Sequence, residues 1–203
     1  TNIINRLLKH SDGNVYAFCN RSVFKCSMNQ TVETVFPDIA IPSPTYSVAQ
    51  APDKDIYIGT ESNGLYIYSE NWKLKKHVPI DGIIATILPD NNGDIWLGLD
   101  ETGICLFNKN KQTFTWLHKD NTNLNNNSIR TFVPYGDSSI LVGTFRGLNI
   151  LNKKELTITP ANINIAGKGG LSHYSIHSML IDKDQTLWIG TYSAGVNYHS
   201  PFY

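Results

Sequence analysis

The chain consists of short apolar runs separated by turns that are rich in Asp, Asn and Gly. Several runs are apolar on consecutive positions, which is typical of strands that are covered on both faces. No run follows the period of 3.6 residues that an amphipathic helix requires. The pattern therefore predicts an all-β protein.

One motif recurs: an acidic turn, a strand ending in glycine, a tight loop and a second glycine. It occupies residues 53–68, 93–107, 137–150 and 182–198, and residues 12–18 form an eroded copy without the glycines. The central bulky residues of the copies are spaced by 41, 39, 45 and 47 positions: Tyr16, Tyr57, Trp96, Leu141 and Trp188. A β-type repeat with a period near 40 is typical of a propeller blade.

Each repeat resolves into four expected strands: an apolar leading strand, the motif strand, a third strand after the loop, and a polar outer strand. The first glycine of the motif should permit a close approach or a bulge, and the second should adopt a positive φ. Trp96 and Trp188 should lie in the core, whereas Trp72 and Trp116 fall on or beside outer strands and should pack between blades or at a subunit edge. The predicted repeat core comprises Tyr57, Gly59, Gly64, Trp96, Gly98, Gly103, Gly143, Gly147, Trp188, Gly190 and Gly195.

The predicted fold is a β-propeller of about five four-stranded blades. The expected blades span approximately residues 1–40, 41–80, 81–122, 123–169 and 170–203, the last without its outer strand. Because no N-terminal segment can supply that strand, we expect a partial arc of a larger, seven-bladed type of propeller. Such an arc would expose apolar blade faces, so we expect it to associate or to be covered by a second copy.

The motif Asp-x-x-Gly-x-Leu-Trp-Ile-Gly-Thr-x-x-x-Gly-Leu resembles the two-component regulator propeller repeat. Residues 171–198 and 124–130 carry the closest similarity, and the resemblance extends over nearly the whole chain. The chain departs from the pattern at Phe18 in place of the first glycine, at Leu99 in place of Thr, and at Leu141 in place of the aromatic residue.

The resemblance implies the periplasmic sensor region of a Bacteroides-type hybrid two-component histidine kinase that is anchored in the inner membrane. Such a parent detects an oligosaccharide and signals through a phosphorelay to polysaccharide-utilisation genes. The implied partners are the remaining blades, the downstream sensor domains and a second copy in a homodimer. This segment would not be an enzyme, because kinase activity belongs to another part of the parent.

Composition and charge exclude further classes of function. Lys and Arg together number 17, as do Asp and Glu, so the formal charge is zero, which excludes a basic nucleic-acid surface. No apolar stretch approaches the length of a membrane span, and the chain does not open on a signal peptide. The three cysteines form no metal pattern; Cys19 and Cys26 could bridge one hairpin, but a buried free thiol is the better interpretation.

The sequence contains no catalytic motif and no sign of a cofactor. The one metal-ligand spacing, His173 and His177, would bind a metal on a helix, but it falls on an expected strand. The cluster Gly167–Gly170 predicts a flexible loop rather than a phosphate cradle. The repeated acids precede the motif strand at a fixed position, so they are expected to form Asx turns. These acids are Asp12, Asp53, Asp90, Asp137 and Asp182.

In a propeller, the loops between the second and third strands share a face with the loops that enter the first strand. We call this face the rim. Its aromatic rings could stack on sugars, while Arg and the amides of Asn125, Asn126 and Asn127 could bind hydroxyls or carboxylates. The candidate ligand-binding residues are Arg130, Phe145, Arg146, His173, Tyr174 and Tyr192.

Two alternatives stay open. A carbohydrate-active propeller enzyme, a lyase or a glycosidase, needs paired carboxylates or a His–Tyr pair on the central axis. Arg130 and His177 are the obvious inward polar candidates on the leading strands. A protein-interaction scaffold of the WD-repeat type would carry Trp-Asp and Gly-His signatures, which this sequence lacks.

Overall fold

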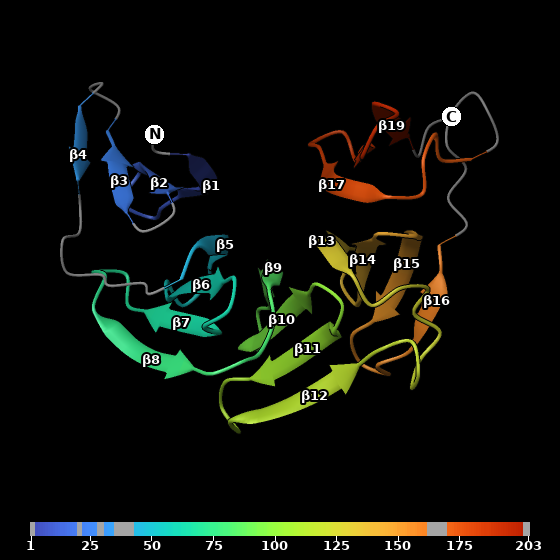
Figure 1. Cartoon of the computed structure of the whole chain (residues 1–203), viewed down its shortest axis with the longest axis horizontal. Helices are drawn as coiled ribbons and strands as arrows, with labels where there is room; N and C mark the ends of the chain where they lie inside the picture. Colours follow the sequence, from blue (N-terminus) through green and yellow to red (C-terminus); the bar gives the residue numbers. More distant parts are fainter. Residues whose placement is uncertain (1–2, 20–21, 28–30, 35–42, 162–169, 201–203) are drawn as a thin grey trace. The chain divides into compact units, whose positions relative to one another are not determined.

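The computed structural model describes residues 3–19, 22–27, 31–34, 43–161 and 170–200, and all regular secondary structure in them is β-strand (Figure 1). These residues form two compact units. Unit 1 comprises residues 1–97 with 107–113, and unit 2 comprises residues 98–106 with 114–203. Gly167, Gly169 and the last three residues lie outside the described part.

Five antiparallel sheets follow one another along the chain, each with its strands in sequence order. The first two lie in unit 1: β1 (Ile4–Lys9), β2 (Val15–Cys19), β3 (Val23–Cys26) and β4 (Val32–Thr34), then β5 (Thr45–Gln50), β6 (Ile56–Thr60), β7 (Leu65–Tyr68) and β8 (Leu74–Val78). The third contributes residues to both units: β9 (Ile84–Pro89), β10 (Asp94–Leu99), β11 (Gly103–Asn108) and β12 (Thr113–Leu117).

The last two sheets lie in unit 2 and consist of β13 (Ile129–Tyr135), β14 (Ser139–Thr144), β15 (Gly147–Asn152) and β16 (Ile158–Pro160), then β17 (Ile176–Ile181), β18 (Leu187–Thr191) and β19 (Val196–His199). Four sheets have four strands, and the fifth has three among the described residues. Repeated up-and-down sheets of this kind are the blade unit of a propeller. The predicted all-β class is confirmed.

Unit 1 has a core in which the first sheet packs against the second. Tyr16 and Phe18 of β2 contact a cluster that includes Ile56, Ile58 and Tyr68 of the second sheet. Trp72, just before β8, packs onto this cluster, with its ring centroid 4.7 Å from that of Tyr16. Packing between blades, the first of the two roles predicted for Trp72, is thus confirmed.

Unit 2 has a corresponding core in which Val133, Leu141 and Leu148 pack against Ile176, Leu187 and Ile189 of the next sheet. The motif strand β14 is buried at every position but its first, as consecutive apolar residues predict. Leu141 therefore fills the aromatic position of the motif without loss of burial.

The prediction that Trp188 lies in the core is wrong. Trp188 is 41% exposed, whereas Trp96 at the same motif position is 1% exposed. Leu187 and Ile189, on the other face of β18, are the residues that pack against β13–β15. Trp188 points to the opposite face, where its Nε1 donates to Asp182 Oδ2 at 2.7 Å and its ring lies near Tyr198.

The predicted conformation of the second glycine is confirmed in every regular copy of the motif. The φ angles are 73° at Gly64, 98° at Gly103, 114° at Gly147 and 75° at Gly195. An L residue would be strained in this left-handed region. These glycines therefore fix the turn between the second and third strands.

All three cysteines are free. Cys19 ends β2, while Cys26 pairs with Val15 at the other end of the same hairpin, so a bridge between them would not fit. Burial raises the pKa of the Cys105 thiol to about 12. Cys105 is therefore a small apolar core residue rather than a reactive group.

Candidate functional site

The leading strand of four sheets carries a bulge near its first residue. The pairing with the second strand skips one residue in β1, β5, β13 and β17. The skipped residues are Asn5, Tyr46, Arg130 and His177. Because a bulge bends the strand and redirects a side chain, these positions are suited to present functional groups.

The first glycine of the motif lies where each bulge packs against its partner strand. A Cβ at Gly59 would lie 2.4 Å from Ser47 Oγ and 2.6 Å from Ile84 Cγ2. At Gly143 it would lie 2.7 Å from both Thr131 Cγ2 and Ile176 Cγ2. The predicted close approach is confirmed at these positions, and it explains why the motif contains a glycine there.

The threonine that follows this glycine closes the adjacent loop. Thr60 Oγ1 donates to Gly64 O at 2.8 Å, and Thr144 and Thr191 make the same bond to Gly147 and Gly195 at 3.0 Å. The next residue is tied to the loop that enters the blade: Phe145 N donates to Ser128 O, and Tyr192 N donates to Ser175 O, both at 3.0 Å. The turn chemistry thus brings the residue after Thr close to the bulge residue of the same blade.

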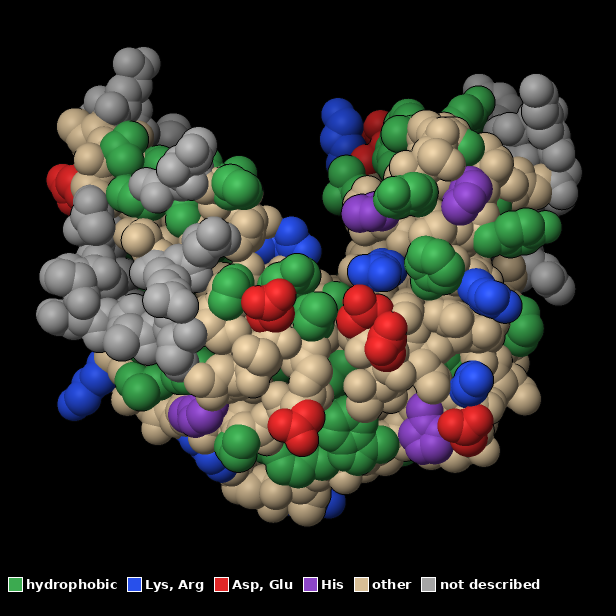
Figure 2. Space-filling view, in the orientation of Figure 1, with side chains coloured by type: hydrophobic (Ala, Val, Ile, Leu, Met, Phe, Trp, Pro, Cys, Tyr) green, Lys and Arg blue, Asp and Glu red, His purple; other side chains and the backbone are tan. Residues whose placement is uncertain are grey.

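In unit 2 this arrangement gathers several predicted site residues on the rim. The Arg130 guanidinium lies 5.9 Å from the centroid of the Phe145 ring, and its Nη1 is 3.5 Å from Asp100 Oδ2. One blade further, the His177 ring stacks on Tyr192 with centroids 5.9 Å apart. Figure 2 shows basic, acidic, histidine and hydrophobic side chains next to one another over this part of unit 2.

The remaining predicted residues occupy the neighbouring loops. His173 Nδ1 accepts a hydrogen bond of 3.0 Å from Ser175 N, so the neutral imidazole carries its proton on Nε2. The side chain of Arg146 is exposed, and its backbone N donates to Thr144 Oγ1. Tyr174 is 74% exposed and Tyr192 is 70% exposed. Large exposed rings of this kind offer surfaces on which a ligand can stack.

The side-chain oxygens of Asn125, Asn126 and Asn127 already accept hydrogen bonds within the chain, and ligand binding by these amides stays a prediction. Asn125 Oδ1 accepts from Thr144 Oγ1 at 2.8 Å and from Asn149 Nδ2 at 2.7 Å. The oxygens of Asn126 and Asn127 accept from the backbone N–H groups of Ser128 and Lys119. These amides hold the rim loops in place, because buried or turning backbone groups need such partners.

Sequence reasoning placed the loop at Glu61 on the rim but chose no ligand-binding residue from the part of the rim that belongs to unit 1. A cavity of about 480 Å³ is lined there by Ile4, Asn5, Arg6, Pro44, Thr45, Tyr46 and Glu61. Asn5 and Tyr46 are bulge residues, and Glu61 follows Thr60 as Phe145 follows Thr144. Aligning the leading strands on Thr45-Tyr46-Ser47 and Ile176-His177-Ser178 would have found Tyr46.

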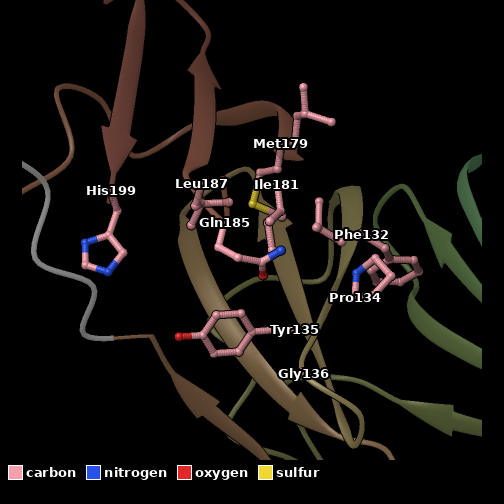
Figure 3. Close-up of a pocket in the computed structure, with 11 residues that line it drawn as sticks. Phe132, Pro134, Tyr135, Gly136, Met179, Ile181, Gln185, Leu187 and His199 are labelled. Atoms are coloured by element: carbon pink, nitrogen blue, oxygen red, sulfur yellow. The ribbon is translucent and has the colours of Figure 1, made fainter. Parts of the chain in front are cut away.

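A second cavity, of about 620 Å³, lies in unit 2 at the other ends of β13 and β17 (Figure 3). Tyr135, Gln185 and His199 are its main polar groups, and none of the described residues that line it is charged. The other lining residues are Phe132, Val133, Pro134, Gly136, Met179, Leu180, Ile181 and Leu187. No sequence feature predicted this cavity, and the rim, with charged groups beside exposed rings, is the stronger candidate.

The predicted Asx turns are confirmed at three of the five repeated acids. Asp12, Asp53 and Asp182 each accept, through Oδ1, the backbone N–H two residues further on. The Trp188 indole, followed by the backbone N–H of Thr186, lowers the pKa of Asp182. Within the described ranges no group of His, Cys, Asp and Glu could hold a metal ion, and no helix has the length and apolar character needed to cross a membrane.

Residues 170–193 match the family model described as two component regulator propeller. This match confirms the resemblance predicted from the motif. Comparison with curated proteins gives no match.

Solved structures give the fold class as a β-propeller. The extracellular domain of the putative hybrid two component system BT3049 from B. thetaiotaomicron is 25% identical, with a TM-score of 0.75, over 98% of this chain and 27% of that one. The corresponding domain of BT4673 is 20% identical, with a TM-score of 0.79, over 99% and 27%. PorZ of Porphyromonas gingivalis, a component of the type-IX secretion system, is 18% identical, with a TM-score of 0.68, over 96% and 32%. The chain thus spans about a quarter of the length of the first two.

Proposed function

We propose that this β-propeller chain, which carries a two-component regulator propeller repeat at residues 170–193, is an extracytoplasmic ligand-binding segment of a hybrid two-component sensor. Support comes from the BT3049 extracellular domain, which is similar over 98% of this chain. In this proposal the segment lies in the periplasm, and its parent is anchored in the inner membrane and controls polysaccharide-utilisation genes through a phosphorelay.

We further propose that the rim of unit 2 binds an oligosaccharide. The observation that carries this proposal is the pairing of Phe145 with Arg130 and of Tyr192 with His177 on one loop face. In each pair an exposed ring lies beside a hydrogen-bonding group, the combination by which proteins contact the apolar face and the hydroxyls of a sugar.

A binding role fits the rim better than hydrolysis does. The described bulge positions hold Asn, Tyr, Arg and His, and the nearby Asp100 already faces Arg130. Glycoside hydrolysis ordinarily needs two carboxyl groups about 5–9 Å apart. We therefore propose binding rather than hydrolysis for this rim.

The experiment is a glycan array with the 203-residue chain, followed by calorimetric titration of each binder. Phe145→Ala and Tyr192→Ala should each weaken binding by about tenfold, the loss expected for a stacked ring. Phe114→Ala is the matched control, because Phe114 is a half-exposed ring on the outer strand β12. Binding that survives both rim variants would move the site away from the rim, and an array without any binder would refute carbohydrate sensing.

A further inference from the structure

Arg130 is held in place while its hydrogen-bonding capacity is left unused. Its Nε is buried and has no hydrogen-bond partner in the described part of the chain. Its one ionic neighbour, Asp100 Oδ2, lies 3.5 Å from Nη1, beyond the 2.7–2.9 Å of a charge-assisted hydrogen bond. A guanidinium offers five N–H donors, and a third of the Arg130 side chain is exposed, so the exposed N–H groups are open to a ligand that supplies acceptors.

The guanidinium is nevertheless well positioned. Arg130 is the bulge residue of β13, which turns its side chain toward the rim. The Phe145 ring stacks beside it at 5.9 Å, and two-thirds of its side chain is buried. A planar cation with a fixed orientation and unused donors suits a planar or tetrahedral anion that accepts two parallel hydrogen bonds.

Resting on the proposed function, we propose that the rim ligand is an acidic sugar whose carboxylate or sulfate group binds Arg130. The sugar ring that carries the anion lies against Phe145, and a neighbouring sugar ring stacks on Tyr192. Arg146, whose side chain is exposed on the same loop as Phe145, adds a second positive charge.

Substitutions of Asp100 and Glu101, the acids near Arg130, provide controls for the proposal. If the role of Arg130 were to pair with Asp100, then Arg130→Gln and Asp100→Asn would have the same effect on every ligand. If Arg130 binds an anion, Asp100→Asn removes a competing negative charge, and binding of the anion stays equal or becomes tighter. Glu101 is exposed, and Glu101→Gln controls for general charge effects on the same loop.

The test uses matched ligands and the 203-residue chain. The first arm compares oligogalacturonides with their methyl esters, which keep the ring and lose the charge. The second arm compares a sulfated galactose disaccharide with its unsulfated form, and so distinguishes sulfate from carboxylate. An array of acidic and neutral glycans of other ring stereochemistry accompanies both arms.

We expect binding of acidic members with little or no binding of their neutral counterparts. Arg130→Gln should weaken binding of the acidic ligand by about tenfold to a hundredfold, while Arg130→Lys restores part of it. Neutral glycans that bind at the rim as tightly as acidic ones, with no effect of Arg130→Gln, would overturn the acidic-sugar proposal and leave the proposed function standing. An array without any binder would overturn both.

Discussion

At the scale of single residues, one methyl group decides how closely neighbouring strands can approach. Gly143 and Gly190 occupy the same motif position, yet their surroundings differ. A Cβ at Gly143 would press on carbon atoms of Thr131 and Ile176 at 2.7 Å, whereas at Gly190 it would meet the Ser178 hydroxyl at 2.5 Å, with other atoms beyond 3.5 Å. A hydroxyl can rotate away, but a packed isoleucine cannot without moving its strand.

We therefore expect Gly143→Ala to lower the free energy of unfolding by about 1–3 kcal/mol and Gly190→Ala to lower it by less than about 1 kcal/mol. Urea unfolding followed by circular dichroism measures both. Equal losses at the two sites would contradict the packing described at Gly143.

The two motif tryptophans provide a second residue-scale test. Trp96 is 1% exposed, so Trp96→Ala should leave a cavity and cost about 3–5 kcal/mol. Trp188 is 41% exposed, so its side chain buries much less apolar surface on folding. Trp188→Ala should therefore cost about 1–2 kcal/mol. The same unfolding measurement checks the order, and a larger loss at Trp188 would restore its assignment to the core.

At the scale of elements, buried amides tie the rim loops to the third strand in two blades of unit 2. Asn149, on β15, is fully buried; its Nδ2 donates to Asn125 Oδ1 at 2.7 Å, and its Oδ1 accepts from Asn125 N at 3.3 Å. Asn197, on β19, repeats this with Ser172: its Nδ2 donates to Ser172 Oγ at 2.7 Å, and its Oδ1 accepts from Ser172 N at 3.0 Å. The geometry of the rim therefore depends on residues that no ligand would touch.

We expect Asn149→Ala to accelerate amide hydrogen exchange in residues 123–128, because Asn125 loses both partners on β15. Asn152→Ala is the matched control: Asn152 Oδ1 accepts from Lys154 N and Glu155 N at the other end of β15. Its loss should accelerate exchange in residues 153–156 alone. Unchanged exchange in residues 123–128 of Asn149→Ala would show that the amide does not hold the loop.

The elements also show which features of the fold could be predicted from the sequence. Strands and turns were predictable, because apolar runs, turn acids and the glycine at positive φ act within a few residues of each other. The first glycine left a close approach and a bulge as alternatives, and the sequence did not place the bulges at Tyr46 and Arg130, because a bulge is a mismatch between two strands and depends on what packs opposite the glycine.

The same limit applies to the candidate site. The loops that carry Phe145 and Tyr192 were predictable, because their position follows from the repeat, while ligand binding by Arg130, Phe145 and Tyr192 stays a prediction. The hydrogen bonds of Asn125 and Asn127 could not be predicted, because their partners Asn149 and Lys119 lie on other strands and loops. The burial of Trp188 depends on which face of β18 another sheet covers. The motif is apolar on both faces of the strand, so the sequence does not indicate the covered face.

At the scale of the whole molecule, charge and apolar surface act together. The 17 basic and 17 acidic residues leave no net charge, so electrostatic repulsion between copies is weak. One face of the β17–β19 sheet carries a row of apolar side chains, since Leu180 pairs with Trp188 and Trp188 pairs with Tyr198. Leu180, Trp188 and Tyr198 are 61%, 41% and 44% exposed, and Val196 on the same face is 67% exposed.

A contiguous exposed apolar patch of this kind favours self-association, because two copies can remove it from water.

We expect the 203-residue chain to show a sedimentation coefficient that rises with concentration in the micromolar range. The double variant Leu180→Lys and Val196→Lys should abolish the rise without loss of folding, since both side chains are mostly in solvent. The single variant Leu74→Lys places a charge on a half-exposed leucine of the outer strand β8 and should leave association unchanged. A constant sedimentation coefficient for the parent chain would refute association, and a rise that persists in the double variant would assign it to another surface.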